Sequence, residues 1–367
     1  MEKKDIFCSI YNEANKKKSK VKVIYPQENK TSPFTSLDNV KNSIFLAGPC
    51  PRSNYRATDW REKTYGILEN LCFDGYVINP TNENYNEKDP DALKKQTEWE
   101  YEAMHKASAI IFNLDRNEEH PGMTTCVEIA TYWNYPGIYV YMPDDNKMTP
   151  NKYIRIHCAE KGIPIYNTLE DCYAAVVRDL NRPGKVWYTS DTHFGQERTL
   201  NFSKRPFKTV REMDLELISN WNKRVRHNDI VYHLGDFGES FDYLNCLNFK
   251  TLNFVKGNYE KDKIPEIMKD LKKRDDVNIY DNDECTVDSG EFHYILRHEP
   301  VIGKKISKDM LCLYGHIHGR TLVKTNGIDV GVDGHLYAPM SQEDVDFFAN
   351  AIKQGFYDEN VTSMDCK

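Results

Sequence analysis

The chain has 367 residues, of which 40% are hydrophobic and 12% aromatic, and its formal net charge is −7 at pH 7. A chain of this length and composition can bury two sizeable cores, so we predict two domains. The acidic balance argues against a broad nucleic-acid-binding surface, because binding along a phosphate backbone needs clustered basic residues.

The sequence contains no feature typical of secretion or membrane insertion. No apolar stretch approaches the roughly 18–20 residues of a membrane-spanning helix, and no signal-peptide core follows the first residues. We therefore expect a cytoplasmic protein without membrane contact. The ten cysteines include no Cys-x-x-Cys pair, which favours reduced packing residues over a zinc ribbon or a disulfide framework.

Composition along the chain predicts its organisation. Residues 1–20 are polar and rich in lysine, and are expected to form an extension. A first domain then covers residues 21–180. The Asn-Arg-Pro-Gly run at 181–184 is the best linker candidate. A second domain covers 185–340, and a helix with a polar tail forms 341–367.

Strand-like apolar runs alternate with helical patterns in the first predicted domain. The runs lie at residues 43–49, 76–80, 109–114 and 137–141, and the clearest helical patterns lie at 60–71 and 169–180. This alternation predicts a parallel sheet with helices on both faces, a Rossmann-like (flavodoxin-like) α/β fold. In such folds small ligands bind at the carboxyl ends of strands. The turn at Gly48 and Pro49, followed by polar Arg52, lies at such a place.

Residues 121–130 contain the clearest candidate for a catalytic side chain in this domain, because they place Glu128 in a helical pattern after two threonines. A purely structural interpretation is available. Thr125 and Glu128 have the spacing of a capping box, so Glu128 could serve only to cap the start of a helix.

Four segments together resemble the nucleoside 2-deoxyribosyltransferase-like family, over about residues 22–180. They are Phe45-Leu46-Ala47-Gly48-Pro49, Asn79-Pro80, Gln96-Thr97-Glu98-Trp99-Glu100, and Met123-Thr124 through Glu128-Ile129. The resemblance implies that Glu128 attacks the anomeric carbon of a nucleoside to form a glycosyl-enzyme ester, chemistry that suits a carboxylate. It implies Asp115 as the acid or base-binding partner. The family's helix usually continues with Gly where this chain has Ala130.

The same resemblance implies a set of substrate contacts in the first domain. They are Gly48, Pro49, Arg52, Asn79, Trp99, Met123 and Thr124. For Trp99 the alternative is packing, because an aromatic residue on a helix more often belongs to a core. Relatives commonly build their sites between subunits, so a homo-oligomer formed through this domain is also implied.

Five short motifs follow one another in the second predicted domain, each directly after an apolar run that reads as a buried strand. The motifs are Asp191-Thr192-His193, Gly235-Asp236-Phe237-Gly238, Gly257-Asn258-Tyr259-Glu260, Arg297-His298-Glu299-Pro300 and Gly315-His316-Ile317-His318. The apolar runs lie at 186–188, 230–232, 252–255, 294–296 and 311–314. The polar side chains therefore lie where strands end and loops begin.

These motifs predict a two-metal site. They supply two Asp, one Asn and four His without a thiolate, and such mixed N/O ligands suit Mn, Fe, Zn or Ni better than Ca. Two cations about 3.5–4 Å apart need a shared carboxylate, and together they can activate water and neutralise phosphate charge. Asp236 is the natural bridge. Taken alone, an Asp-x-His or Gly-Asp motif usually marks only a turn.

The second half, about residues 185–336, resembles the calcineurin-like metallophosphoesterases, especially in Ser190-Asp191-Thr192-His193-Phe194-Gly195 and Tyr232-His233-Leu234-Gly235-Asp236-Phe237. The resemblance implies a four-layer α/β/β/α sandwich and two divalent metals, with manganese the first choice. One metal would be held by Asp191, His193 and His318, and the other by Asn258, His298 and His316, with Asp236 between them. The family usually has His where this chain has Tyr259. A phenol with an ordinary pKa of about 10 is a poorer proton donor than imidazole. We therefore expect this difference from the family to affect the substrate class and the rate more than the metal site.

Between the first two motifs, Arg205 lies in a loop that contains proline. An arginine fork suits phosphate, so Arg205 is a candidate substrate contact, with ordinary solvation as the alternative. The helical pattern that follows places Leu215, Ile218 and Trp221 on one face, which favours core packing over ligand contact.

These predictions combine into a bifunctional nucleotide-processing enzyme that acts on nucleosides, nucleotides or phosphate esters. One domain would act at an N-glycosidic bond and the other at a phosphate ester. The main alternative is a phosphoesterase regulated by a non-catalytic nucleotide-sensing first domain. A nuclease is a weaker alternative because of the acidic charge.

Overall fold

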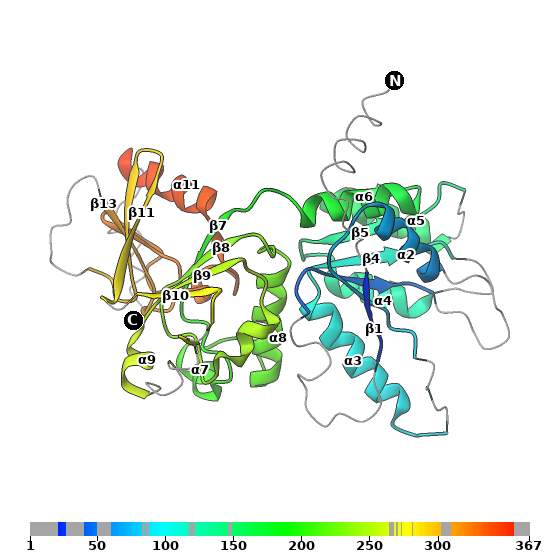
Figure 1. Ribbon diagram of the computed structural model, residues 1–367, viewed down its shortest axis with the longest axis horizontal. Coiled ribbons are helices and arrows are strands. Elements are labelled where there is room, and N and C mark those ends of the chain that lie inside the picture. Colours follow the sequence, from blue (N-terminus) through cyan, green and yellow to red (C-terminus); the bar gives the residue numbers. More distant parts are fainter. Residues whose placement is uncertain are drawn as a thin grey trace. The chain divides into compact units, whose positions relative to one another are not determined.

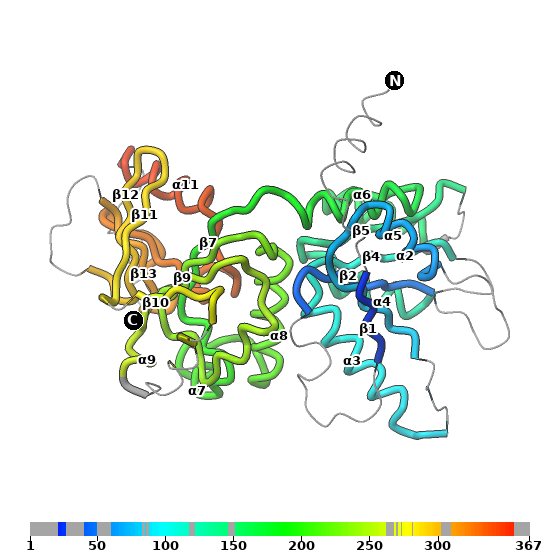
Figure 2. The backbone as a smooth tube through the Cα atoms, in the orientation of Figure 1, coloured from blue at the N-terminus to red at the C-terminus, as the bar shows by residue number. Residues whose placement is uncertain are grey.

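The computed structural model describes residues 21–26, 40–49, 60–82, 85, 88–116, 122–145, 149–263, 268, 271–272, 274–280, 282–301 and 310–355. The chain divides into two compact units, Met1–Arg182 and Pro183–Lys367. Figure 1 shows their helices and strands, and Figure 2 traces the backbone. No helix among the described residues is both long and apolar enough to cross a membrane.

The first unit is built on one parallel sheet in the order β1-β3-β2-β4-β5-β6. Its strands are β1 (Lys22–Ile24), β2 (Ser43–Ala47), β3 (Tyr76–Ile78), β4 (Ala109–Asn113), β5 (Ile138–Tyr141) and β6 (Ile165–Tyr166). Its helices are α2 (Trp60–Asn70), α3 (Ala92–Lys106), α4 (Met123–Tyr132), α5 (Thr149–Lys161) and α6 (Leu169–Leu180). From β3 to β6 the order is that of flavodoxin, so the chain reverses direction across the sheet between β2 and β4, where such folds bind ligands.

Helices cover both faces of this sheet because side chains alternate along its strands. Ile44 and Leu46 of β2 pack with residues of α2 and α6. Phe45 and Ala47 pack on the opposite face with residues of α3, α4 and α5. Both faces are therefore buried at the central strands β2 and β4, which explains why these strands read as continuous apolar runs.

The second unit contains two five-stranded sheets. The first has the order β10-β9-β8-β7-β16 and comprises β7 (Val186–Thr189), β8 (Ile230–His233), β9 (Thr251–Val255), β10 (Val277–Tyr280) and β16 (Met340–Ser341). The second has the order β11-β12-β13-β15-β14 and comprises β11 (Glu284–Ser289), β12 (Phe292–Arg297), β13 (Met310–Tyr314), β14 (Val323–Lys324) and β15 (Gly327–Asp329). The helices are α7 (Glu197–Phe202), α8 (Val210–Asn222), η1 (Phe241–Cys246), α9 (Asn258–Lys263), η2 (Val332–Gly334) and α11 (Gln342–Lys353).

The two sheets of the second unit share one core. Tyr188 and Val255 of the first sheet pack in the same buried cluster as Leu296 and Leu313 of the second. Ala349 of α11 joins this cluster. The predicted fold class, a Rossmann-like sheet followed by an α/β sandwich, is confirmed.

One local expectation is wrong. Helix α4 begins at Met123, and its N-cap is Gly122, which has φ 54° and no capping side chain. Thr125 and Glu128 therefore lie inside the helix and do not form a capping box at its start. Glycine adopts a positive φ without strain, so the helix can begin here without a polar cap.

Candidate functional sites

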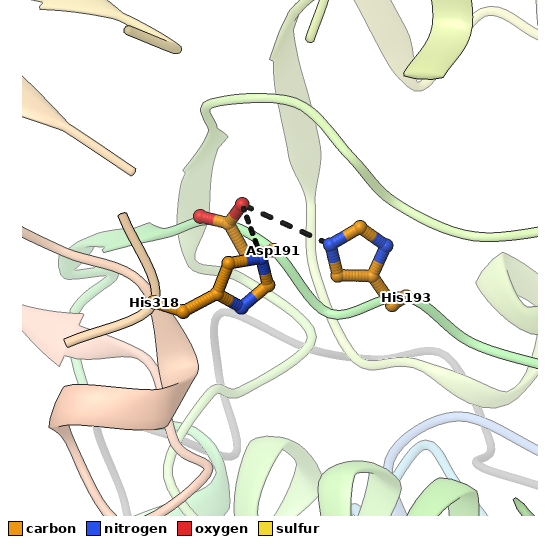
Figure 3. Close-up of side chains that lie close together, drawn as sticks. All are labelled: Asp191, His193 and His318. Atoms are coloured by element: carbon orange, nitrogen blue, oxygen red, sulfur yellow. Dashed lines mark ion pairs between the residues drawn. The ribbon is translucent and has the colours of Figure 1, made fainter. Parts of the chain in front are cut away.

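The polar motifs of the second unit converge at the ends of its strands. Asp191 and His193 follow β7, Asp236 follows β8, and His298 follows β12. Asn258 begins α9 after β9, and His316 and His318 follow β13. A bridge between Ser190 and Gly331 joins the chain after β7 to the chain after β15. Residues up to 127 positions apart thus meet in one place, as His318 and Asp191 show in Figure 3.

Asp191, His193 and His318 form a first cluster with the geometry of a cation site. The Nε2 atoms of His193 and His318 each lie 3.9 Å from Oδ1 of Asp191 (Figure 3). Two metal–ligand bonds of roughly 2.0–2.2 Å could span such a gap, which is too long for a hydrogen bond. Oδ1 of Asp191 and Nε2 of His193 are buried without a hydrogen-bond partner. Because orphaned buried polar atoms are costly, these residues fit a bound divalent cation.

A second cluster is made by Asp191, Asp236 and His298, whose candidate ligand atoms also lie close together. Oδ1 of Asn258 is 2.9 Å from Nε2 of His298 and 3.1 Å from Nδ1 of His316. The two histidine nitrogens are 3.2 Å apart. All seven residues predicted as ligands thus lie in these two adjoining groups.

Asp236 lies between the two clusters. Its Oδ2 is 3.6 Å from Nε2 of His193, and its Oδ1 is 3.5 Å from Nε2 of His298. The backbone N–H of Tyr259 donates to Oδ1 at 2.9 Å. Each carboxylate oxygen therefore faces a different histidine, which is the arrangement that a bridging ligand needs.

Five of the seven predicted ligands have left-handed backbone conformations. The φ angles are 57° for Asp191, 51° for His193, 55° for Asp236, 70° for His316 and 52° for His318. Such angles are uncommon outside glycine and cluster at functional sites. Glycines let these loops approach one another: a Cβ on Gly257 would overlap Oδ1 of Asp236, and one on Gly315 would overlap Oδ2 of Asp191.

Hydrogen bonds orient two of the histidines toward the clusters. Nδ1 of His298 donates to the carbonyl of Leu234 at 2.8 Å, and Nδ1 of His193 lies 3.0 Å from Oε1 of Gln196. With the proton on Nδ1, each ring presents an Nε2 lone pair to the site. Burial lowers the pKa of His193 to about 4, so this ring is neutral.

Glu260 supports two of the ligand loops, although its motif alone gave no reason to assign it a role. Its buried carboxylate accepts from the backbone N–H groups of Asp236, Phe237 and Gly257 at 2.8–2.9 Å. Burial and the neighbouring charge of Asp236 raise its pKa. The only sequence signal for this role is the position of Glu260 two residues after Asn258.

Arg205 does not lie on the surface of the site. Its side chain is fully buried, and the guanidinium donates to Asp333 and to the backbone carbonyls of Asp191 and Thr192. This geometry favours support of the first ligand loop over the predicted contact with phosphate.

Tyr259 lies half-exposed beside the first cluster. Its ring meets that of His193 edge-on, with 6.5 Å between the centroids. Burial and the charge of Glu239 raise the pKa of its phenol, which therefore stays neutral. The guanidinium of exposed Arg198 lies 5.2 Å from the Tyr259 ring centroid. Arg198 is a candidate contact for an anion, although nothing in the sequence around it predicted this role.

In the first unit, the charge of Glu128 on α4 interacts with that of a second carboxylate, Glu100 on α3. Burial and the charge of Glu100 raise the pKa of Glu128 to about 7, against the opposing charge of Arg61. Glu100 accepts from Nε2 of Gln96 at 2.7 Å, and burial raises its own pKa. Buried Arg61 donates to the carbonyls of Gly48 and Pro49 at 3.0 and 3.2 Å. The sequence analysis quoted Glu100 within a family segment without giving it a role, and it missed Arg61.

Two of the predicted substrate contacts in this unit, Gly48 and Asn79, are held by close packing or by hydrogen bonds within the protein. A Cβ on Gly48 would come within 2.9 Å of Trp60 and Asn113. The side chain of Asn79 accepts from the N–H of Thr81 at 2.9 Å and donates to the Tyr65 hydroxyl at 2.8 Å.

The other predicted residues of the first unit differ in exposure. Trp99 is half-buried and packs against the core. Met123 and Thr124 are exposed at the start of α4. Asp115 is exposed after β4, and its charge contributes to the raised pKa of Tyr141. Arg52 lies outside the described residues.

Comparison with known proteins identifies both halves. Residues 41–146 match the family described as nucleoside 2-deoxyribosyltransferase like, and residues 185–349 match the calcineurin-like phosphoesterase superfamily domain. The chain thus combines these two kinds of domain, as predicted. The family matched by residues 185–349 uses divalent metals, and the match points to a hydrolase.

Individual relatives add little about function. An uncharacterised protein of Methanocaldococcus jannaschii is 29% identical over 185 residues, which are 47% of this chain and 93% of that protein. A crystal structure of a protein of unknown function from Aquifex aeolicus aligns with a TM-score of 0.36 and 24% identity, over 45% of this chain and 98% of the other.

Proposed function

We propose that the second unit hydrolyses phosphate esters with two divalent metal ions, manganese being the first choice. The main support is the convergence of carboxylate, amide and imidazole groups around the unpartnered Oδ1 of Asp191 and Nε2 of His193. This N/O donor set suits Mn, Fe, Zn or Ni. Asp191, His193 and His318 would hold one ion. Asn258, His298 and His316 would hold the other, with Asp236 shared.

The surrounding residues suit an anionic substrate. When bound, the metal ions supply charge that neutralises the phosphate and activates water. The guanidinium of Arg198 is exposed. Among the described residues it makes one hydrogen bond, in which Nε donates to Oε1 of Gln196 at 3.3 Å. Its terminal nitrogens can therefore donate to phosphate oxygens. Tyr259 gives the substrate an aromatic surface next to His193.

Metal removal tests this proposal. We expect the full-length protein to hydrolyse an aryl phosphate mono- or diester with Mn²⁺ or a similar ion, and chelation to abolish the reaction because the nucleophile and the charge neutralisation disappear together. The measurement is the rate before chelation, after it and after Mn²⁺ is restored, with metal content determined each time. Full activity in metal-free protein would rule the proposal out.

Replacing Tyr259 with His should raise monoester hydrolysis relative to diester hydrolysis. If the missing imidazole limits monoester cleavage, restoring it should help, because imidazole can donate a proton to the leaving oxygen near neutral pH, whereas the raised pKa of the phenol makes it a weak donor. Tyr259→Phe is the matched control, because it keeps the ring beside His193 and Arg198 and removes only the hydroxyl. The check is the ratio of the two rates in fully metallated variants. An unchanged ratio in Tyr259→His would count against this role.

For the first unit, we propose cleavage or transfer at the N-glycosidic bond of a nucleoside or nucleotide. A carboxylate oxygen of Glu128 would bond to the anomeric carbon as the bond to the base breaks, and the base would leave with a proton. Water or a second base would then release the sugar and restore the carboxylate. The negative charge of Glu100 supports this proposal, because it raises the pKa of Glu128 and two interacting carboxyls can divide the roles of acid and nucleophile. Assembly into a homo-oligomer through this unit stays a prediction.

A further inference from the structure

A buried ion pair connects two loops that carry predicted metal ligands. Asp333 in η2 accepts from Nε and a terminal nitrogen of Arg205, each at 2.8 Å. The same carboxylate oxygen that accepts the terminal nitrogen also lies 2.8 Å from Nδ1 of His318. Asp333 therefore contacts a ligand from the loop after β13 and an arginine from the loop after α7.

Asp333 determines which nitrogen of His318 is available as a ligand. The two oxygens of Asp333 form a two-pronged ion pair with the guanidinium of Arg205. Oγ of Ser203 also lies 2.9 Å from Nδ1 of His318, and a hydroxyl can accept as well as donate. An ionised carboxylate only accepts hydrogen bonds, so Nδ1 of His318 carries the proton. Nε2 then presents its lone pair toward Oδ1 of Asp191, 3.9 Å away.

Arg205 extends the connection to the other loop. One terminal nitrogen donates to the carbonyl of Thr192 at 2.8 Å, and the second donates to the carbonyl of Asp191 at 2.6 Å. These carbonyls belong to a segment in which Asp191 and His193 have φ angles of 57° and 51°. A planar fork with several fixed donors can hold such a backbone, whereas lysine has one flexible ammonium group.

We propose that Arg205 and Asp333 are positioning residues that align His318 and the Asp191 loop for one of the two metal ions. This inference rests on the proposed metal centre. Among the described residues, the hydrogen bonds of the pair reach the Asp191 loop and His318, and none reaches Asn258, His298 or His316. Because His318 belongs to the first cluster alone, loss of the pair should weaken that metal site more than the other.

Asp333→Asn is the sharpest test because it keeps the size of the side chain. In the native pair both carboxylate oxygens accept, one from Arg205 and the other from Arg205 and His318. Asparagine has a single acceptor oxygen, so its amide N–H group must face a donor on one side. We expect one ion per chain to bind about 10–100-fold more weakly, as when outer partners of metal ligands are removed.

The measurement is Mn²⁺ binding to the full-length protein by calorimetry and metal analysis, with the thermal stability of the metal-free form recorded alongside. Wild type should bind two ions tightly, Asp333→Asn one tightly and one weakly, and Arg205→Lys should show the same pattern. The matched control is Asp276→Asn, which alters a two-pronged pair with Arg274 at 2.9 Å that involves no predicted ligand. It should leave both ions tightly bound.

The outcomes separate the two proposals. If wild type binds no divalent ion, the proposed metal centre itself fails. If wild type binds two ions and Asp333→Asn binds both equally well, the positioning role is wrong. Equal weakening of both ions, together with a less stable metal-free form, would indicate a general structural role and would also overturn the inference.

Discussion

Asp236→Asn is expected to lower phosphate-ester hydrolysis by about 100-fold or more. Asp236 faces His193 with one oxygen, at 3.6 Å, and His298 with the other, at 3.5 Å. A neutral amide offers one good ligand atom and no negative charge, so both ions would be held more weakly. Metal ions contribute several kcal/mol to such transition states, and each ~1.4 kcal/mol corresponds to about tenfold in rate.

The measurement is kcat/KM for an aryl phosphate ester across a Mn²⁺ titration, with bound metal determined for each variant. Asp288→Asn is a suitable control, because Asp288 pairs with His293 at 2.7 Å but both side chains are exposed on the second sheet. That variant should match wild type. A fully active Asp236→Asn variant would remove Asp236 from the centre. Weakening of both ions would distinguish Asp236 from Asp333, for which selective loss of one ion is expected.

Glu128→Gln is expected to reduce base release from nucleosides by orders of magnitude. An amide is a far weaker nucleophile than a carboxylate. Because the N-cap of α4 is Gly122 and Glu128 lies within the helix, the substitution removes no helix cap, and we expect stability to change by at most about 1 kcal/mol. Phosphate-ester hydrolysis should be unaffected.

The assay is base release from a panel of deoxynucleosides and their 5′-monophosphates, with mass spectrometry of trapped protein to detect a glycosyl adduct. Glu98→Gln, an exposed position on α3, is the matched control and should release base as wild type does. No release by wild type across the panel would favour the nucleotide-sensing alternative. Equal release by wild type and Glu128→Gln would exclude Glu128 from the mechanism.

The pH dependence of base release gives an independent check on Glu128. Burial and Glu100 raise its pKa to about 7. Since the ionised form attacks, the rate should increase about tenfold per pH unit well below pH 7. A rate that is flat between pH 5 and 8 would show that a group with this pKa does not limit the reaction.

Much of the fold could be predicted because it depends on local sequence. The apolar runs at 43–49 and 109–114 became β2 and β4, the helical pattern at 169–180 became α6, and the helix expected within 341–367 became α11. Strands buried on both faces must be apolar throughout, so they stand out in the sequence. Short strands such as β1 and β14 were missed because two or three residues carry no periodicity.

By itself the sequence determined the pair of families, the strand framework and the set of candidate metal ligands, because motif order and ligand chemistry are properties of the chain. Tertiary structure alone decided the rest. It brought Glu100 near enough for its charge to raise the pKa of Glu128, and it joined Arg205 to Asp333, 128 positions further along the chain. It also imposed the left-handed backbone of Asp191 and His318. These features arise where loops from different strands meet, and the packing that forces them together leaves no local pattern in the sequence.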